Sequence, residues 1–164
     1  MRSSRIAVQS AAVALFIGLA AIVTAWGFEV IGGYLPCKLC YQERIPYYVG
    51  LPVLAVALAQ ARARPALFRA LCVLGAAIFA VGFAMGTYHA GAEWGFWPGP
   101  SDCGGGAAPT ANARDLMSQM RSTRLVSCTE ATFRVLGLSF AGWNAAASLA
   151  VAGLAAFAAS RPRP

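Results

Sequence analysis

Residues 70–92 read ALCVLGAAIFAVGFAMGTYHAGA and contain no Asp, Glu, Lys or Arg. A helix needs about 20 apolar residues to cross the hydrocarbon core of a bilayer, so this run is long enough to span a membrane. Three further charge-free runs cover residues 6–28, 45–61 and 135–160. The whole chain is 59% hydrophobic and only 12% charged. These patterns predict an all-α membrane protein with no soluble domain.

The expected architecture is a bundle of four transmembrane helices that forms a single membrane domain over residues 1–164. A chain in lipid must satisfy its own backbone hydrogen bonds, which helices do. The second charge-free run is short, but Tyr41 and its neighbours extend it at the membrane surface. We expect helices at about residues 6–28, 42–61, 68–89 and 137–159, and loops at about residues 29–41 and 90–136. In the longer loop, Thr110–Arg121 has the pattern of a short amphipathic helix in the interface plane.

The net charge of +7 is distributed unevenly along the chain. Basic residues without acidic neighbours flank the expected helices at one end of the bundle: Arg2, Arg5, Arg62, Arg64, Arg69, Arg161 and Arg163. The opposite end carries the other basic residues together with all the acidic ones, and its charges balance. An excess of Lys and Arg marks the cytoplasmic side of a membrane protein. We therefore expect cytoplasmic termini and exported loops, and no surface for nucleic acid.

Aromatic residues support this orientation. They gather at the outer ends of the first three helices, where aromatic belts meet the lipid headgroups. The residues are Trp26, Phe28, Tyr34, Tyr41, Tyr47, Tyr48, Tyr88, Trp94, Phe96 and Trp97.

Four of the five cysteines fall in the exported loops. Cys37 and Cys40 form a CxxC motif shortly after the first apolar run, and Cys103 and Cys128 lie in the second loop. An exported compartment permits disulfides, and two cysteine pairs on one face can pass electrons by thiol–disulfide exchange. Cys72 lies near the cytoplasmic end of the third helix, where a cysteine usually serves as a small apolar residue, and we assign it no role.

Arg44 follows Cys40 by four residues. If the second helix begins near the CxxC motif, the two side chains share one face, a turn apart. A guanidinium there would stabilise a Cys40 thiolate or a developing oxyanion. The alternative is that Arg44 pairs with Glu43 or with a lipid headgroup, as arginines at helix ends commonly do.

Two other interpretations of the cysteines remain open. Four cysteines are the number of ligands that a structural zinc site requires, although the second pair lacks the usual short spacing. A non-enzymatic membrane protein with two structural disulfides also fits. Redox lability separates these cases, because structural disulfides resist mild thiol exchange whereas catalytic disulfides are readily reduced.

Three segments resemble the disulfide bond formation protein B (DsbB) family of bacterial inner-membrane oxidoreductases. The first is residues 37–48, CKLCYQERIPYY; the second is residues 88–97, YHAGAEWGFW, followed by Gly99, Pro100 and Cys103; the third joins Cys128, Thr129 and Glu130 to residues 136–139 and 142–144. The resemblance covers nearly the whole chain. The vitamin K epoxide reductase-like proteins use a similar bundle and relay, but the position of Arg44 and the third segment favour the DsbB family.

The resemblance implies two redox disulfides, Cys37–Cys40 and Cys103–Cys128. Cys103 would form a mixed disulfide with a reduced periplasmic thioredoxin-fold oxidase of the DsbA type. Cys128 would then attack the first disulfide at Cys37 and release Cys40 as a thiolate.

The resemblance also implies that a membrane quinone, ubiquinone or menaquinone, accepts the electrons beside Cys40. Arg44 would help to hold this quinone, and His89, the only histidine, would assist its protonation. The expected location is the bacterial inner membrane, with the redox loops facing the periplasm. The expected partners are the DsbA-type oxidase, the quinone and membrane lipid, and no metal ion is expected.

Overall fold

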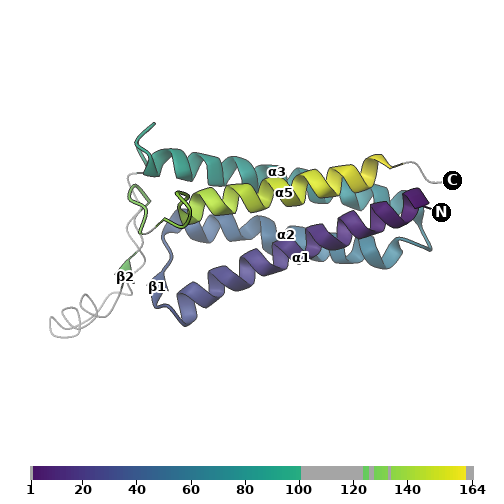
Figure 1. The fold of residues 1–164 in the computed structure, drawn as a ribbon, viewed down its shortest axis with the longest axis horizontal. Helices are drawn as coiled ribbons and strands as arrows, with labels where there is room; N and C mark the ends of the chain where they lie inside the picture. The colour runs from purple at the N-terminus through teal and green to yellow at the C-terminus, as the bar shows by residue number, and fades with distance from the viewer. Residues whose placement is uncertain (1, 101–123, 126–127, 133, 162–164) are drawn as a thin grey trace.

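The computed structural model describes residues 2–100, 124–125, 128–132 and 134–161. Within these residues, four long helices run side by side (Figure 1). The helices are α1 (Arg2–Val30), α2 (Lys38–Gln60), α3 (Pro65–Glu93) and α5 (Phe140–Ser160), and the two short strands are β1 (Tyr34–Leu35) and β2 (Arg124–Leu125). The helical architecture predicted from the sequence is therefore confirmed. The amphipathic helix expected at Thr110–Arg121 lies outside the described residues.

Side-chain caps fix where two of the helices begin. α2 starts at Lys38, earlier than expected, because Cys37 Sγ accepts a hydrogen bond from the backbone N–H of Cys40 at 3.3 Å. Ser139 Oγ acts in the same way for α5 and accepts from the N–H of Gly142 at 3.2 Å. The CxxC motif therefore forms the first turn of α2 rather than part of the preceding loop.

Small residues allow the helices to approach one another closely. A Cβ on Gly50 of α2 would lie 2.5 Å from the Phe79 ring of α3, and a Cβ on Gly86 of α3 would lie 2.9 Å from the backbone nitrogen of Ala145 in α5. Phe79 is fully buried and meets Tyr47 edge-on, with 5.2 Å between ring centroids. Close approach through small residues is typical of helix packing in membranes.

Three helical segments are long and apolar enough to cross a membrane, namely Ser4–Val30, Pro65–Glu93 and Phe140–Ser160. The 23 residues of α2 span about 34 Å, which matches a hydrocarbon core of about 30 Å. Its composition is more polar than that of the other three, and its buried residues include Glu43. A fourth membrane crossing by α2 therefore remains a prediction.

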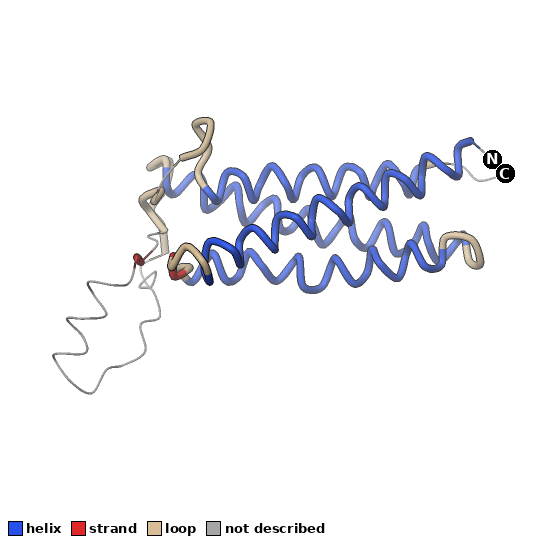
Figure 2. The backbone as a smooth tube through the Cα atoms, turned by 60° about the horizontal axis from the view of Figure 1, so that its bottom comes forward, coloured by secondary structure: helices blue, strands red, loops and turns tan. Residues whose placement is uncertain are grey.

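The two ends of the bundle differ in character. Both termini and the turn between α2 and α3 lie at one end, and β1 and β2 lie at the other (Figures 1 and 2). Cys72 is buried at the end that holds the termini, in a cluster with Phe68 and several alanines. Cys37, Cys40 and Cys128 lie toward the opposite end, because they follow β1 and β2 in the chain.

The two strands join the loops that carry the cysteines. β1 pairs with β2 in parallel, and Leu35 lies opposite Leu125. Parallel pairing sends both segments onward in the same direction. Cys37 and Cys128 follow these paired residues closely in the sequence, so the pairing brings two distant cysteines to the same place.

Candidate functional site

Cys37 and Cys40 face each other across the first turn of α2. Their Sγ atoms lie 2.8 Å apart, and both residues are thiols rather than a disulfide. Cys37 is completely buried, whereas Cys40 is partly exposed and lines a cavity. The two cysteines of the motif therefore have different surroundings, with Cys37 turned inward and Cys40 turned toward the cavity.

The thiol of Cys37 is unusually acidic. Its pKa is lowered to about 4, chiefly because the Cys40 thiol donates a hydrogen bond to its sulfur. Burial opposes this shift, and the adjacent His89 adds to it. A thiolate is the nucleophile and the metal ligand in cysteine chemistry, so Cys37 is chemically prepared for either role.

Cys128 reaches the same place from the second loop. It is buried and disulfide-bonded, and the predicted partner Cys103 lies outside the described residues. The sulfurs of Cys37 and Cys128 and a ring nitrogen of His89 all lie within 4.8 Å of one another. The structure thus brings together three of the residues that the sequence singles out, from three separate segments.

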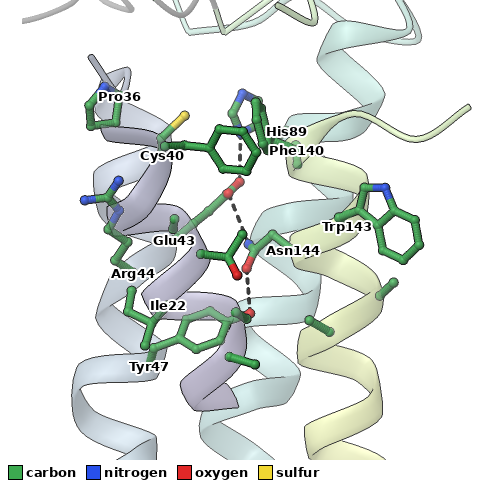
Figure 3. Close-up of a pocket in the computed structure, with 18 of the residues that line it drawn as sticks. Ile22, Pro36, Cys40, Glu43, Arg44, Tyr47, His89, Phe140, Trp143 and Asn144 are labelled. Carbon is green, nitrogen blue, oxygen red and sulfur yellow. Dashed lines mark hydrogen bonds and ion pairs between the residues drawn. The ribbon is translucent and has the colours of Figure 1, made fainter. Parts of the chain in front are cut away.

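A chain of buried polar groups extends from His89 into the bundle. His89 Nδ1 lies 2.8 Å from Glu43 Oε1, and the amide of Asn144 donates to Glu43 Oε2 at 3.1 Å. Tyr47 then donates from its hydroxyl to Asn144 Oδ1 at 2.7 Å and lies 3.1 Å from Ser148 Oγ. Figure 3 shows this chain of contacts linking α3, α2 and α5. Buried polar groups in a membrane helix usually mark a functional pathway.

The cavity beside Cys40 has a volume of about 590 Å³. Apolar residues of α1 and α5 form most of its wall, including Ile17, Ala20, Ala21, Ile22, Ala146, Ala147 and Ala150. Its polar lining includes Cys40, Glu43, Arg44, His89, Glu93 and Asn144. Such a cavity suits a small apolar molecule with a polar head, since ligand sites commonly measure about 300–1,000 Å³ with few polar groups.

Arg44 lines this cavity, but its ion-pair partner is neither Glu43 nor a lipid headgroup, the two partners expected from the sequence. It pairs with Glu29 of α1, which also accepts a hydrogen bond from the Tyr41 hydroxyl at 3.1 Å. The guanidinium lies 5.3 Å from the Tyr41 ring centre. Glu43, its sequence neighbour, points instead toward His89 and Asn144 (Figure 3). Because arginine has five N–H donors, the pair with Glu29 leaves donors for a ligand.

The sequence pattern did not predict site roles for Glu43, Asn144, Tyr47 and Ser148. A signal for them exists, because Glu43 and Tyr47 are four residues apart on α2, as are Asn144 and Ser148 on α5. Both pairs therefore place polar groups on one helix face. Tyr47 was expected in an interfacial belt, but it is only 3% exposed because its ring packs on Phe79.

Comparison with known proteins agrees with the geometry. A curated relative, "Uncharacterized protein RP370" of Rickettsia prowazekii, is 27% identical over 136 residues, which is 80% of this chain and 76% of that protein. No solved structure matches the chain. The family model described as "Disulfide bond formation protein DsbB" matches residues 8–158. The chain therefore belongs to the DsbB family, a family of helical membrane proteins of disulfide bond formation.

Proposed function

We propose that this protein is a quinone-dependent thiol oxidoreductase that reoxidises a periplasmic dithiol oxidase of the DsbA type. The proposal rests on one observation: the two cysteines of the CxxC motif have different surroundings. Cys37 faces the sulfur of Cys128, and Cys40 faces a largely apolar cavity. One motif can thereby exchange electrons with a protein thiol on one side and a lipid-soluble carrier on the other.

The first exchange takes place between the two cysteine pairs. The partner's dithiol reduces the disulfide of Cys103 and Cys128, and the Cys128 thiolate attacks Cys37 Sγ of the oxidised CxxC motif. The Cys37–Cys40 bond breaks, a Cys37–Cys128 bond forms, and the electron pair stays on Cys40 as a thiolate. The separation of at most 4.8 Å between the sulfurs of Cys37 and Cys128 supports this step.

The cavity fits a quinone head. Its walls are apolar enough for the ring and the start of an isoprenoid chain, and Arg44 and His89 offer hydrogen-bond donors at the polar surface. When bound, the quinone supplies the acceptor for two electrons and two protons. Arg44 would hold the polar head of the quinone through its N–H donors, and Cys40 would supply the thiolate at the same cavity.

His89 and Glu43 would handle the protons. In the reduced motif the Cys40 thiol carries the proton and is only partly exposed beside the completely buried Cys37, so a proton that leaves the motif needs a base within the bundle. The His89 ring lies within reach of Cys37 Sγ and is joined through Nδ1 to the Glu43 carboxylate. Glu43 lines the cavity, so it would hold a proton at Oε1 or Oε2 on the cavity side.

The proposed location is the bacterial inner membrane with the redox loops in the periplasm. The end that holds the termini carries Arg5, Arg62, Arg64, Arg69 and Arg161. This cluster supports a cytoplasmic assignment by the positive-inside rule. The opposite end would then meet the oxidising compartment, where a DsbA-type partner is found.

The deciding experiment mixes the purified protein with a quinone and a reduced DsbA-type oxidase and follows the absorbance of the oxidised quinone. We expect loss of that absorbance only when the protein, the dithiol and the four cysteines Cys37, Cys40, Cys103 and Cys128 are all present. Cys72→Ala is the matched control and should act at the wild-type rate. Quinone reduction that survives loss of Cys40 would refute the proposal.

A further inference from the structure

Three buried ligand groups converge beside the CxxC motif. The sulfurs of Cys37 and Cys128 and a ring nitrogen of His89 lie within 4.8 Å of one another, and each residue is at most 1% exposed. Two thiolates and an imidazole are ligands that zinc prefers. In the structure Cys128 is disulfide-bonded, so this ligand set exists only after that disulfide is reduced.

The histidine is already oriented for a ligand. Its Nδ1 lies 2.8 Å from a carboxylate oxygen of Glu43, whereas its buried Nε2 has no hydrogen-bond partner among the described residues. Metal-binding histidines characteristically donate their other ring N–H to a carboxylate, which fixes the tautomer and the ring orientation. Glu43 therefore engages Nδ1, and Nε2 is the ring nitrogen left for a ligand beside the two sulfurs.

We propose that the reduced protein binds one zinc-like divalent cation through Cys37 Sγ, Cys128 Sγ and His89 Nε2. Cys40 is the closest candidate for the fourth position, since its sulfur lies 2.8 Å from that of Cys37. Tetrahedral zinc with Zn–S bonds of about 2.3 Å requires sulfurs about 3.8 Å apart. The observed upper limit of 4.8 Å is close enough for side-chain rotation to complete the site.

The chemistry of the site balances without an added oxidant. A reductant of the dithiol or phosphine class gives two electrons to the disulfide of Cys128, and with two protons this leaves one thiol at Cys128 and one at its disulfide partner. The cation then binds the Cys37 sulfur and displaces the thiol proton of Cys128, and this proton passes to solvent without further electron transfer. Binding itself does not depend on the proposed function.

The consequence for turnover does rest on the proposed function. The ligand sulfurs of Cys37 and Cys128 are the same atoms that would exchange electrons in the relay. A thiolate held by a cation cannot attack a disulfide, so the bound cation would hold the protein in its reduced state. The concentration of zinc-like cations at the exported face would thereby set how much enzyme is active.

Direct binding measurements test the site on the full-length protein in detergent. The protein is reduced with a phosphine, freed of reductant without oxygen, and titrated with Co²⁺ as a spectroscopic probe. We expect thiolate-to-cobalt charge-transfer absorption that saturates at one cation per chain. X-ray absorption of the zinc complex should show at least two sulfur ligands and one imidazole. The oxidised protein should show none of this absorption.

Variants separate a built site from unspecific thiol binding. Cys72→Ser keeps the other four cysteines and should bind like the wild type, whereas Cys128→Ser and His89→Ala should lose saturable binding. Glu43→Gln removes the carboxylate behind His89 and should weaken binding about 10–100-fold. Equal cobalt binding by the oxidised protein, or wild-type affinity in a His89→Ala variant that retains its helical circular dichroism, overturns the site.

The wild-type X-ray absorption spectrum decides the question even if a variant fails to fold, because zinc without an imidazole ligand also overturns the site. Quinone reduction measured with a chelator present is independent of the cation. Normal activity with no cation binding would refute the metal site alone. Saturable binding with no quinone reduction would refute the proposed function alone.

Discussion

His89 Nδ1 on α3 lies 2.8 Å from Glu43 Oε1 on α2, and both residues are buried where the helices meet the cysteine-bearing loops. This contact joins the sulfur cluster to the polar lining of the cavity. From the sequence, His89 could be associated with the site only loosely. The contact with Glu43 gives its ring a defined partner and a defined orientation. A buried carboxylate without hydrogen-bond partners would be costly. Glu43 has two such partners, His89 and Asn144.

Glu43→Gln tests the proposed proton route. The amide keeps the size of the side chain but cannot take up a proton, so we expect quinone reduction to fall about 100-fold or more, the usual contribution of a general acid–base group. Glu130→Gln is the control, because Glu130 is exposed. Steady-state assays with quinone and reduced partner measure both. A wild-type rate for Glu43→Gln would remove Glu43 from the proton route.

Arg44→Ala tests the proposed contact with the quinone. A hydrogen bond from a charged donor contributes about 1.5–3 kcal/mol, so the apparent KM for quinone should rise about tenfold or more. Glu29→Gln breaks the ion pair without removing the guanidinium and should change KM much less. An unchanged KM in Arg44→Ala would exclude this role.

Cys103→Ala tests the order of the relay. We expect complete loss of oxidation of the soluble partner, because the first mixed disulfide cannot form. The Cys37–Cys40 disulfide should still form when quinone is added, since the cavity side of the motif is intact. Mass spectrometry after thiol alkylation reads the state of each cysteine. Oxidation of the partner at the wild-type rate would contradict the proposed order.

The acidity of Cys37 predicts a specific pH dependence. Because its pKa is lowered to about 4, the thiolate is present at neutral pH in the reduced protein and is lost only as pH falls through about 4. Thiolate ultraviolet absorbance should follow this titration and should be absent in Cys37→Ser. Cys40→Ala removes the main hydrogen bond and should move the titration to higher pH. An unshifted titration in Cys40→Ala would assign the acidity to another cause.

Gly50→Ala tests the packing between α2 and α3. The added Cβ would lie 2.5 Å from the rigid ring of Phe79, and overpacking of this kind costs about 1–3 kcal/mol. Gly153→Ala is the matched control, since no atom lies within 4 Å of a Cβ there. Thermal unfolding in detergent should show a lower Tm for Gly50→Ala only. Equal Tm values for the two variants would mean that the contact between Gly50 and Phe79 accommodates a methyl group without loss of stability.

Periodicity and charge alone predicted much of the fold. The apolar runs marked the positions of the helices, because a membrane demands a fixed length of uncharged chain. They did not predict that α2 begins at Lys38, because that start depends on a cap by the Cys37 sulfur. Nor did they show that the polar residues of α2 face inward, since burial depends on which helices surround a residue.

The sequence by itself determined the helical membrane class, the family and the identity of the reactive cysteines, because these follow from composition and local spacing. Only the tertiary structure decided which groups meet. The parallel pairing of β1 with β2 places Cys37 beside Cys128, although 90 residues separate them in the chain. The packing of α2, α3 and α5 likewise assembles Glu43, His89 and Asn144. Such contacts depend on the relative placement of distant segments, which no local pattern in the sequence specifies.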